Sequence, residues 1–225
     1  MTDASPPWYR RLVRWLFALA LFPPCVGISW AVVDLVSASG AALHFWVPFL
    51  AGGVCWMVVY LSLPKPMWVY VVGHELTHAL WALLFGARVR KIKVSSKGGH
   101  VVVTKSNSLI VLAPYFFPLY AVLWTLLFSV LGIWLDTRPA MPGFHLGLGI
   151  AYAFHLSLTV QVLRTDQPDL RGEGWFFSLM LIWFAHSLLL LLAIPMLTDR
   201  VRLGTAFGWA LDRTVRVVAR VLHGW

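Results

Sequence analysis

Residues 66–87, PMWVYVVGHELTHALWALLFGA, form a hydrophobic run with two histidines and one glutamate near its middle. The run is close to the roughly 20 residues that an α-helix needs to cross a bilayer. Burying a glutamate in such a helix costs free energy, so ionisable residues at this depth are candidates for a functional site. The stretch therefore predicts a membrane helix with a polar site inside it.

Hydrophobic runs recur along the whole chain of 225 residues, which is 60% hydrophobic and only 12% charged. Soluble domains carry about 25% charged residues, so we expect an all-α polytopic membrane protein, residues 1–225 forming a single membrane domain. We predict about six transmembrane helices, at residues 15–36, 44–63, 66–87, 107–135, 144–163 and 175–197. The net charge of +9 lies in clusters beside these runs. This pattern favours contact with the anionic headgroups of a lipid bilayer and excludes a nucleic-acid partner.

Three features should interrupt or end the helices. Pro23 and Pro24 predict a kink in the first span, and Pro114 and Pro118 predict a break or a re-entrant segment within 107–135. The basic interval 88–107 is rich in β-branched residues on both sides of a Lys-Gly-Gly sequence, which indicates a β-hairpin with a glycine turn. A solvated basic loop is the alternative.

The C-terminal segment 199–225 predicts an amphipathic helix on the membrane surface. Its apolar residues recur at helical spacing, opposite four arginines. The apolar set is Val201, Leu203, Phe207, Leu211, Val215, Val218 and Leu222.

The sequence HELTH at 74–78 carries the chemistry. Residues four apart lie on one face of a helix, about 6 Å apart along its axis, so His74 and His78 can bind one metal ion. Glu75 can take a proton from a water molecule that the metal activates. With 8 histidines and 2 glutamates in the chain, about 0.002 matches to this pattern are expected by chance. Histidines that only form hydrogen bonds between helices are the alternative.

A catalytic zinc ion usually has three protein ligands and one open position. The third ligand must come from the acidic residues near the spans, which are Asp34, Asp136, Asp166, Asp169 and Glu173. The run 165–172, TDQPDLRG, precedes the last span, and its proline and glycine predict a helix break that can line a polar cavity. His155, inside the fifth span, could orient a ligand or stabilise an oxyanion, although a packing role is more common.

With HELTH at 74–78, KGGHV at 97–101 and DLRG at 169–172, the chain resembles the site-2 protease family of intramembrane zinc metalloproteases. That family has H-E-x-x-H in one span, a hairpin with a G-G-like turn after it, and a third-ligand aspartate in an L-D-G motif before a later span. The resemblance covers residues 66–197. Here the aspartate precedes the leucine, and Gln167-Pro168 stands where the family has Asn-Pro.

The resemblance implies that His74, His78 and Asp169 hold one zinc ion, with Glu75 as general base. The resemblance favours Asp169 over Asp166 as the third zinc ligand. It also implies that Gly98 and Gly99 help to present an extended substrate and that Gln167 supports the site.

We therefore expect a zinc endopeptidase that cleaves membrane-spanning peptides, in a multi-pass protein of the bacterial inner membrane. One alternative is a catalytically inactive zinc-binding pseudoprotease that binds membrane clients. Two others are a different membrane zincin that uses Glu173, and a transporter or assembly factor whose histidines serve packing.

Overall fold

The computed structural model describes residues 8–95 and 98–223. Their structure is mainly helical, with one two-stranded antiparallel sheet. The chain divides into two compact units, which are residues 42–167 and residues 1–41 together with 168–225. The prediction of a single membrane domain stays a prediction.

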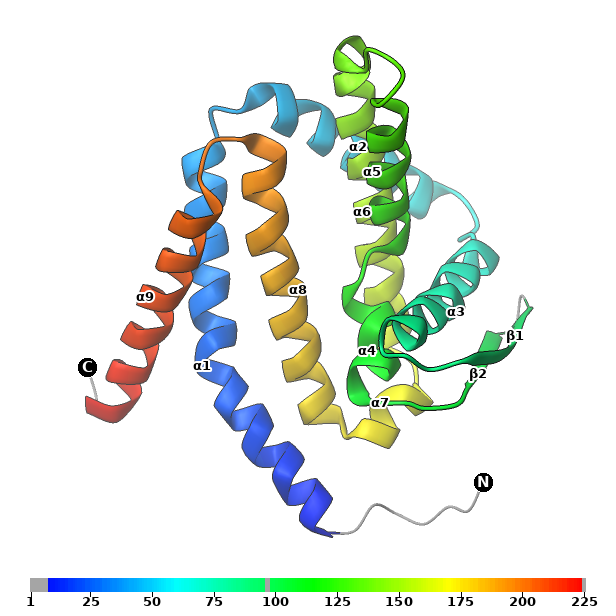
Figure 1. Cartoon of the computed structure of the whole chain (residues 1–225), viewed down its shortest axis with the longest axis vertical. Helices are drawn as coiled ribbons and strands as arrows, with labels where there is room; N and C mark the ends of the chain where they lie inside the picture. Colours follow the sequence, from blue (N-terminus) through cyan, green and yellow to red (C-terminus); the bar gives the residue numbers. More distant parts are fainter. Residues whose placement is uncertain (1–7, 96–97, 224–225) are drawn as a thin grey trace. The chain divides into compact units, whose positions relative to one another are not determined.

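Unit 42–167 holds the helix with the HELTH sequence and the hairpin (Figure 1). Its elements are α2 (Leu43–Ser62), α3 (Met67–Leu84), β1 (Val89–Ser95), β2 (Gly98–Val103), α4 (Ser108–Phe116), α5 (Leu119–Leu131), the 3₁₀ turn η1 (Arg138–Ala140) and α6 (Met141–Leu163). Helices α2 and α6 approach so closely that a Cβ on Gly52 or Gly149 would overlap a backbone carbonyl of the other helix. Close contact at glycine is how membrane helices gain van der Waals packing.

Helix α3 contacts α4, both strands and α5, so it lies among the other elements of its unit. Gly73 allows this, because a Cβ there would lie 2.6 Å from the ring of Tyr120 on α5. On the other side, Tyr70 packs in a buried cluster with Trp56, Phe154 and Leu158. Aromatic packing from α2 and α6 thus fixes the first half of α3.

The second unit contains α1 (Trp8–Ser39), α7 (Pro168–Glu173), α8 (Trp175–Thr198) and α9 (Leu203–His223). Helix α1 packs against both α8 and α9, and Figure 1 shows α9 running alongside α1. The contact with α9 uses small residues, since Ala206 and Ala210 are buried and Thr214 lies against Gly27. Arg213 adds a bidentate hydrogen-bonded ion pair to Asp34 of α1.

Four helical segments among the described residues are long and apolar enough to cross a membrane: α1, α2, residues 138–163 and α8. Helices α4 and α5 make a fifth if the pair counts as one span, but they are bent by 76°. The prediction of a membrane protein agrees with these helices, whereas the count of six spans is not confirmed. Helix α3 is long enough but is not among them, because His74, Glu75 and His78 lower the hydropathy of its 18 residues.

The structure tests the predicted helix break in 107–135 and the predicted hairpin. Residues 107–135 do break, between α4 and α5 at Phe117 and Pro118. Helix α1 is continuous through Pro23 and Pro24, and the kink expected there stays a prediction. The hairpin is confirmed, and the solvated loop is wrong. The glycines do not form its turn, however. Gly98 and Gly99 belong to β2, where they pair with Ser95 and Val94.

Two further expectations concern the hairpin turn and the C-terminal segment. Lys97, which we expected in the hairpin turn, lies outside the described residues, as do residues 1–7, 96 and 224–225. The C-terminal helix is confirmed as α9, and its apolar side chains Phe207, Leu211 and Val215 are exposed. Its packing against α1 through a separate face of small residues was not predicted.

Candidate metal centre

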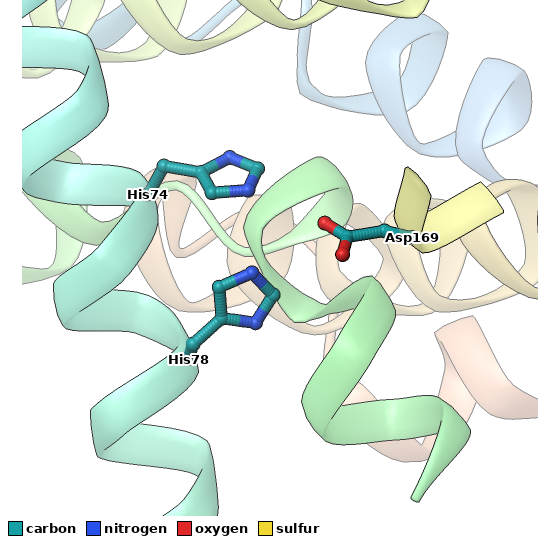
Figure 2. A group of neighbouring side chains, drawn as sticks. All are labelled: His74, His78 and Asp169. Carbon is teal, nitrogen blue, oxygen red and sulfur yellow. The ribbon is translucent and has the colours of Figure 1, made fainter. Parts of the chain in front are cut away.

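His74 and His78 lie one helical turn apart on α3, and their side chains meet. The ring centroids are 4.9 Å apart and the ring planes are at 79° to each other. Figure 2 shows both rings on the same side of α3. The spacing of four residues thus places two imidazoles together, as the sequence predicted.

A backbone carbonyl sets the orientation of His78. Its Nδ1 lies 2.8 Å from the carbonyl oxygen of Ile110, in α4. A carbonyl oxygen only accepts hydrogen bonds, so Nδ1 must carry the proton and donate it. In the neutral ring the lone pair is then on Nε2, which is the tautomer that a metal-binding histidine needs.

The carbonyl of Ile110 is available to His78 because of Pro114. In a regular α-helix, the carbonyl of residue 110 would accept from the N–H of residue 114, but proline has no N–H. The backbone N–H of Ile110 is bound as well. It donates a hydrogen bond of 2.9 Å to the side chain of Asn107, which caps α4. One turn of α4 is therefore built to present a carbonyl oxygen to His78.

Glu75 is buried, with 6% of its surface exposed, and lies against the hairpin. A Cβ placed on Gly99 would be 2.6 Å from Cγ of Glu75 and 2.8 Å from its Oε1. Only glycine lets the backbone of β2 come this close. Gly99 therefore contacts the proposed general base. An added Cβ on Gly98 would meet nothing within 4 Å, but its φ of 135° favours glycine.

His74 borders a small cavity with a volume of about 20 Å³. This volume suffices for one water molecule. His155, which is 7% exposed, lines the same cavity together with Thr77 and Tyr120. The structure thus brings His155 and His74 to one space, as a supporting role for His155 requires.

Three of the five acidic candidates for a third ligand are bound to arginines. Asp34 pairs with Arg213 at 2.9 Å, and Glu173 pairs with Arg14 at 2.8 Å. Asp136, which is exposed, pairs with Arg138 at 2.9 Å, and this hydrogen-bonded guanidinium lowers the pKa of the carboxyl group.

Tyr115 connects His74 to the end of unit 42–167. Its ring meets that of His74 edge-on, with centroids 5.3 Å apart. Its hydroxyl lies 3.5 Å from Oε1 of Gln167, a long polar contact. Asp169, labelled in Figure 2, follows Gln167 by two residues and lies in the first turn of α7.

The sequence reasoning missed Asn107, Ile110 and Tyr115, all of which support the histidines. A signal for Ile110 was present, since a proline four residues later leaves its carbonyl without a helical partner. The residues present fit a zinc ion, because two imidazoles meet and one has its tautomer fixed by a carbonyl oxygen.

Comparison of the chain with protein-family models, with curated proteins and with solved structures gives no match.

Proposed function

We propose that this protein is an intramembrane zinc endopeptidase of the site-2 protease type. The observation that carries the proposal is the hydrogen bond from Nδ1 of His78 to the carbonyl of Ile110. The bond leaves the lone pair of His78 on Nε2, and the ring of a second histidine, His74, has its centroid only 4.9 Å away. Zinc ligands commonly have such a partner, which fixes the ring and raises its basicity.

Asp169 is the proposed third ligand, and chain continuity supports it. Gln167 lies beside Tyr115, which in turn meets His74. Consecutive Cα atoms are 3.8 Å apart, so the Cα of Asp169 lies within about 7.6 Å of that of Gln167. This short connection makes Asp169 the preferred candidate. Asp166 is exposed and Glu173 is engaged by Arg14, so neither is preferred.

A bound zinc ion would supply a Lewis acid that lowers the pKa of a water molecule and polarises a peptide carbonyl. Glu75 would take the proton from this water and later give it to the leaving amine. Burial among α3 and β2 keeps its carboxylate in one position. His155 would hold a water molecule or the developing oxyanion across the cavity that it shares with His74.

The proposed substrate is a membrane-spanning peptide that is locally unwound. The contact of Gly99 with Glu75 supports this, because an extended peptide paired with the hairpin at this point would pass next to the carboxylate. The helices that are long and apolar enough to cross a membrane support a reaction within the bilayer. A bacterial inner membrane is the proposed location.

The test uses the purified full chain in lipid vesicles, with a panel of single-span peptides as probes and mass spectrometry of the products. We expect the wild type to cleave at least one probe and Glu75→Gln to cleave none, while both retain one zinc per chain. Equal cleavage by both proteins would refute the mechanism. If both retain zinc and hold probes without cleaving them, the protein is a client-binding pseudoprotease instead.

Zinc content tests the ligand set separately. We expect His74→Ala, His78→Ala and Asp169→Ala to lose zinc, while Asp166→Ala and Glu173→Ala retain it. Loss of zinc in Glu173→Ala alone would favour another membrane zincin, and a wild type without zinc would favour packing histidines.

A further inference from the structure

The unit formed by residues 1–41 and 168–225 contains a cavity of about 450 Å³ where α1, α7 and α8 meet. This volume lies within the range of about 300–1,000 Å³ that is usual for sites of small ligands. Its walls are Arg11, Arg14, Trp15, Arg171, Gly172, Glu173, Gly174, Trp175, Phe176 and Phe177. None of these residues belongs to the proposed metal centre, so the cavity is a separate feature.

The cavity carries an excess of positive charge. Three arginines face one glutamate, and Arg14 pairs with Glu173 at 2.8 Å. Arg14 also donates a hydrogen bond to the carbonyl of Gly172 at 2.9 Å. The glutamate thus fixes Arg14 in place, and three arginines against one glutamate give the lining residues a net charge of +2.

Aromatic rings form the rest of the wall. Trp15 stacks on Phe176 with centroids 4.8 Å apart, and the guanidinium of Arg14 lies 5.9 Å from the ring centre of Phe177. These contacts join the first turns of α8 to α1. They give the cavity aromatic lining next to its arginines.

The location of the cavity suits a membrane boundary. Its residues lie near the N-terminal ends of α1 and α8, and both helices are long and apolar enough to cross a membrane. Arginine and tryptophan concentrate at such ends, where headgroups meet the hydrocarbon. Along α1, next to the cavity, Leu12 and Leu16 are 50% and 57% exposed, which gives acyl chains a surface to follow.

We propose that this cavity binds the phosphate headgroup of an anionic phospholipid. Guanidinium groups bind phosphate oxygens in a bidentate manner, and a charged pocket between spans is a typical headgroup site. The apolar wall and the exposed leucines favour a lipid over free phosphate, because only a lipid would cover them. The inference does not rest on the proposed proteolysis.

The test measures lipid binding by the full chain in detergent micelles, with phosphatidylglycerol as the probe and native mass spectrometry as the readout. The variant Arg11→Gln/Arg171→Gln removes two charges but spares the pair between Arg14 and Glu173. We expect its affinity for the lipid to fall about 30-fold. The matched control Arg202→Gln/Arg220→Gln removes two exposed charges from another part of the unit and should change the affinity less than threefold.

A second variant should raise the affinity for the lipid, and a misfolded protein would not show such an increase. Glu173→Gln removes the negative charge of the cavity and keeps a hydrogen-bond acceptor for Arg14, so it should bind phosphatidylglycerol more tightly than the wild type. Equal binding of phosphatidylcholine, equal affinities for the double variant and the wild type, or displacement of the lipid by millimolar inorganic phosphate would overturn the proposal.

Discussion

Pro114 acts on His78 through a single carbonyl group. By removing one N–H from α4 it leaves the carbonyl of Ile110 to accept from Nδ1 of His78 at 2.8 Å. The same arrangement occurs at Pro48 in α2, four residues after His44, whose carbonyl oxygen lies 3.0 Å from Nδ1 of His145. The chain thus uses a proline to orient a histidine at two places, and only one is at the proposed metal centre.

Replacing Pro114 tests this arrangement. In Pro114→Ala, the new N–H of residue 114 competes for the carbonyl of Ile110, so His78 loses its fixed tautomer. We expect zinc affinity to fall about 10- to 100-fold, measured by competition with a metal chelator of known affinity. Pro48→Ala makes the same change near His145 and should leave zinc affinity unaltered. An unchanged affinity in Pro114→Ala would show that the carbonyl does not matter.

Gly99 provides a second test at the scale of single residues. A Cβ in Gly99→Ala would lie 2.6 Å from Cγ of Glu75, so the carboxylate must move. We expect the cleavage rate to fall by about 100-fold, the typical cost of misplacing a catalytic group by 1 Å, with zinc content unchanged. Gly143→Ala, where nothing lies within 4 Å of the added atom, is the control. Full activity in Gly99→Ala would contradict the proposed positioning.

What could be predicted from the sequence at this scale follows from local spacing. The interval of four between His74 and His78 determines that the two rings share a face of α3, and burial of Glu75 follows from its place in an apolar helix. The third ligand could not be decided, because the ion pairs that engage Asp34 and Glu173 join residues more than 150 positions apart. Such tertiary pairs leave no mark on local sequence.

At the scale of elements, the length of each hydrophobic run predicted where the long helices lie. The apolar runs did predict α1, α2, α6 and α8, whose composition suits a membrane. The hairpin followed from its β-branched residues, but its glycines had a different reason: Gly99 allows β2 to approach Glu75. A close approach to another element cannot be distinguished from a turn in the sequence alone.

Helix α9 shows how packing can use a face that hydrophobicity does not reveal. Its contact with α1 depends on Gly27, where an added Cβ would lie 2.6 Å from the Cα of Thr214. We expect Gly27→Ala to destabilise the protein by about 1–3 kcal/mol, because two backbones would have to separate. Thermal unfolding in detergent, followed by circular dichroism, measures this change.

The ion pair beside Gly27 should matter less. Asp34 and Arg213 are each about a third exposed, so Asp34→Asn should cost about 1 kcal/mol or less. Gly208→Ala on α9, where the added atom meets nothing within 4 Å, is the control and should not destabilise the helix. A larger effect of Asp34→Asn than of Gly27→Ala would mean that charge, and not close packing, holds α9 to α1.

For the whole molecule, the proposed zinc ligands come from two parts of the chain that are joined at Gln167 and Pro168. His74 and His78 belong to unit 42–167, and Asp169 belongs to the other unit, two residues beyond the boundary at Gln167. A short tether raises the effective concentration of a ligand, and that concentration falls roughly as the −3/2 power of tether length. The number of residues between Gln167 and Asp169 should therefore affect the affinity for zinc.

Lengthening the tether tests this argument without altering any ligand. Ten glycine and serine residues inserted between Gln167 and Pro168 extend it from two to twelve residues, which should lower zinc affinity about 15-fold. The same insertion between Leu135 and Asp136, in an exposed connection inside unit 42–167, should leave the affinity unchanged. Chelator competition measures both. If the first insertion had no more effect than the second, the result would contradict Asp169 as a zinc ligand held by this short connection.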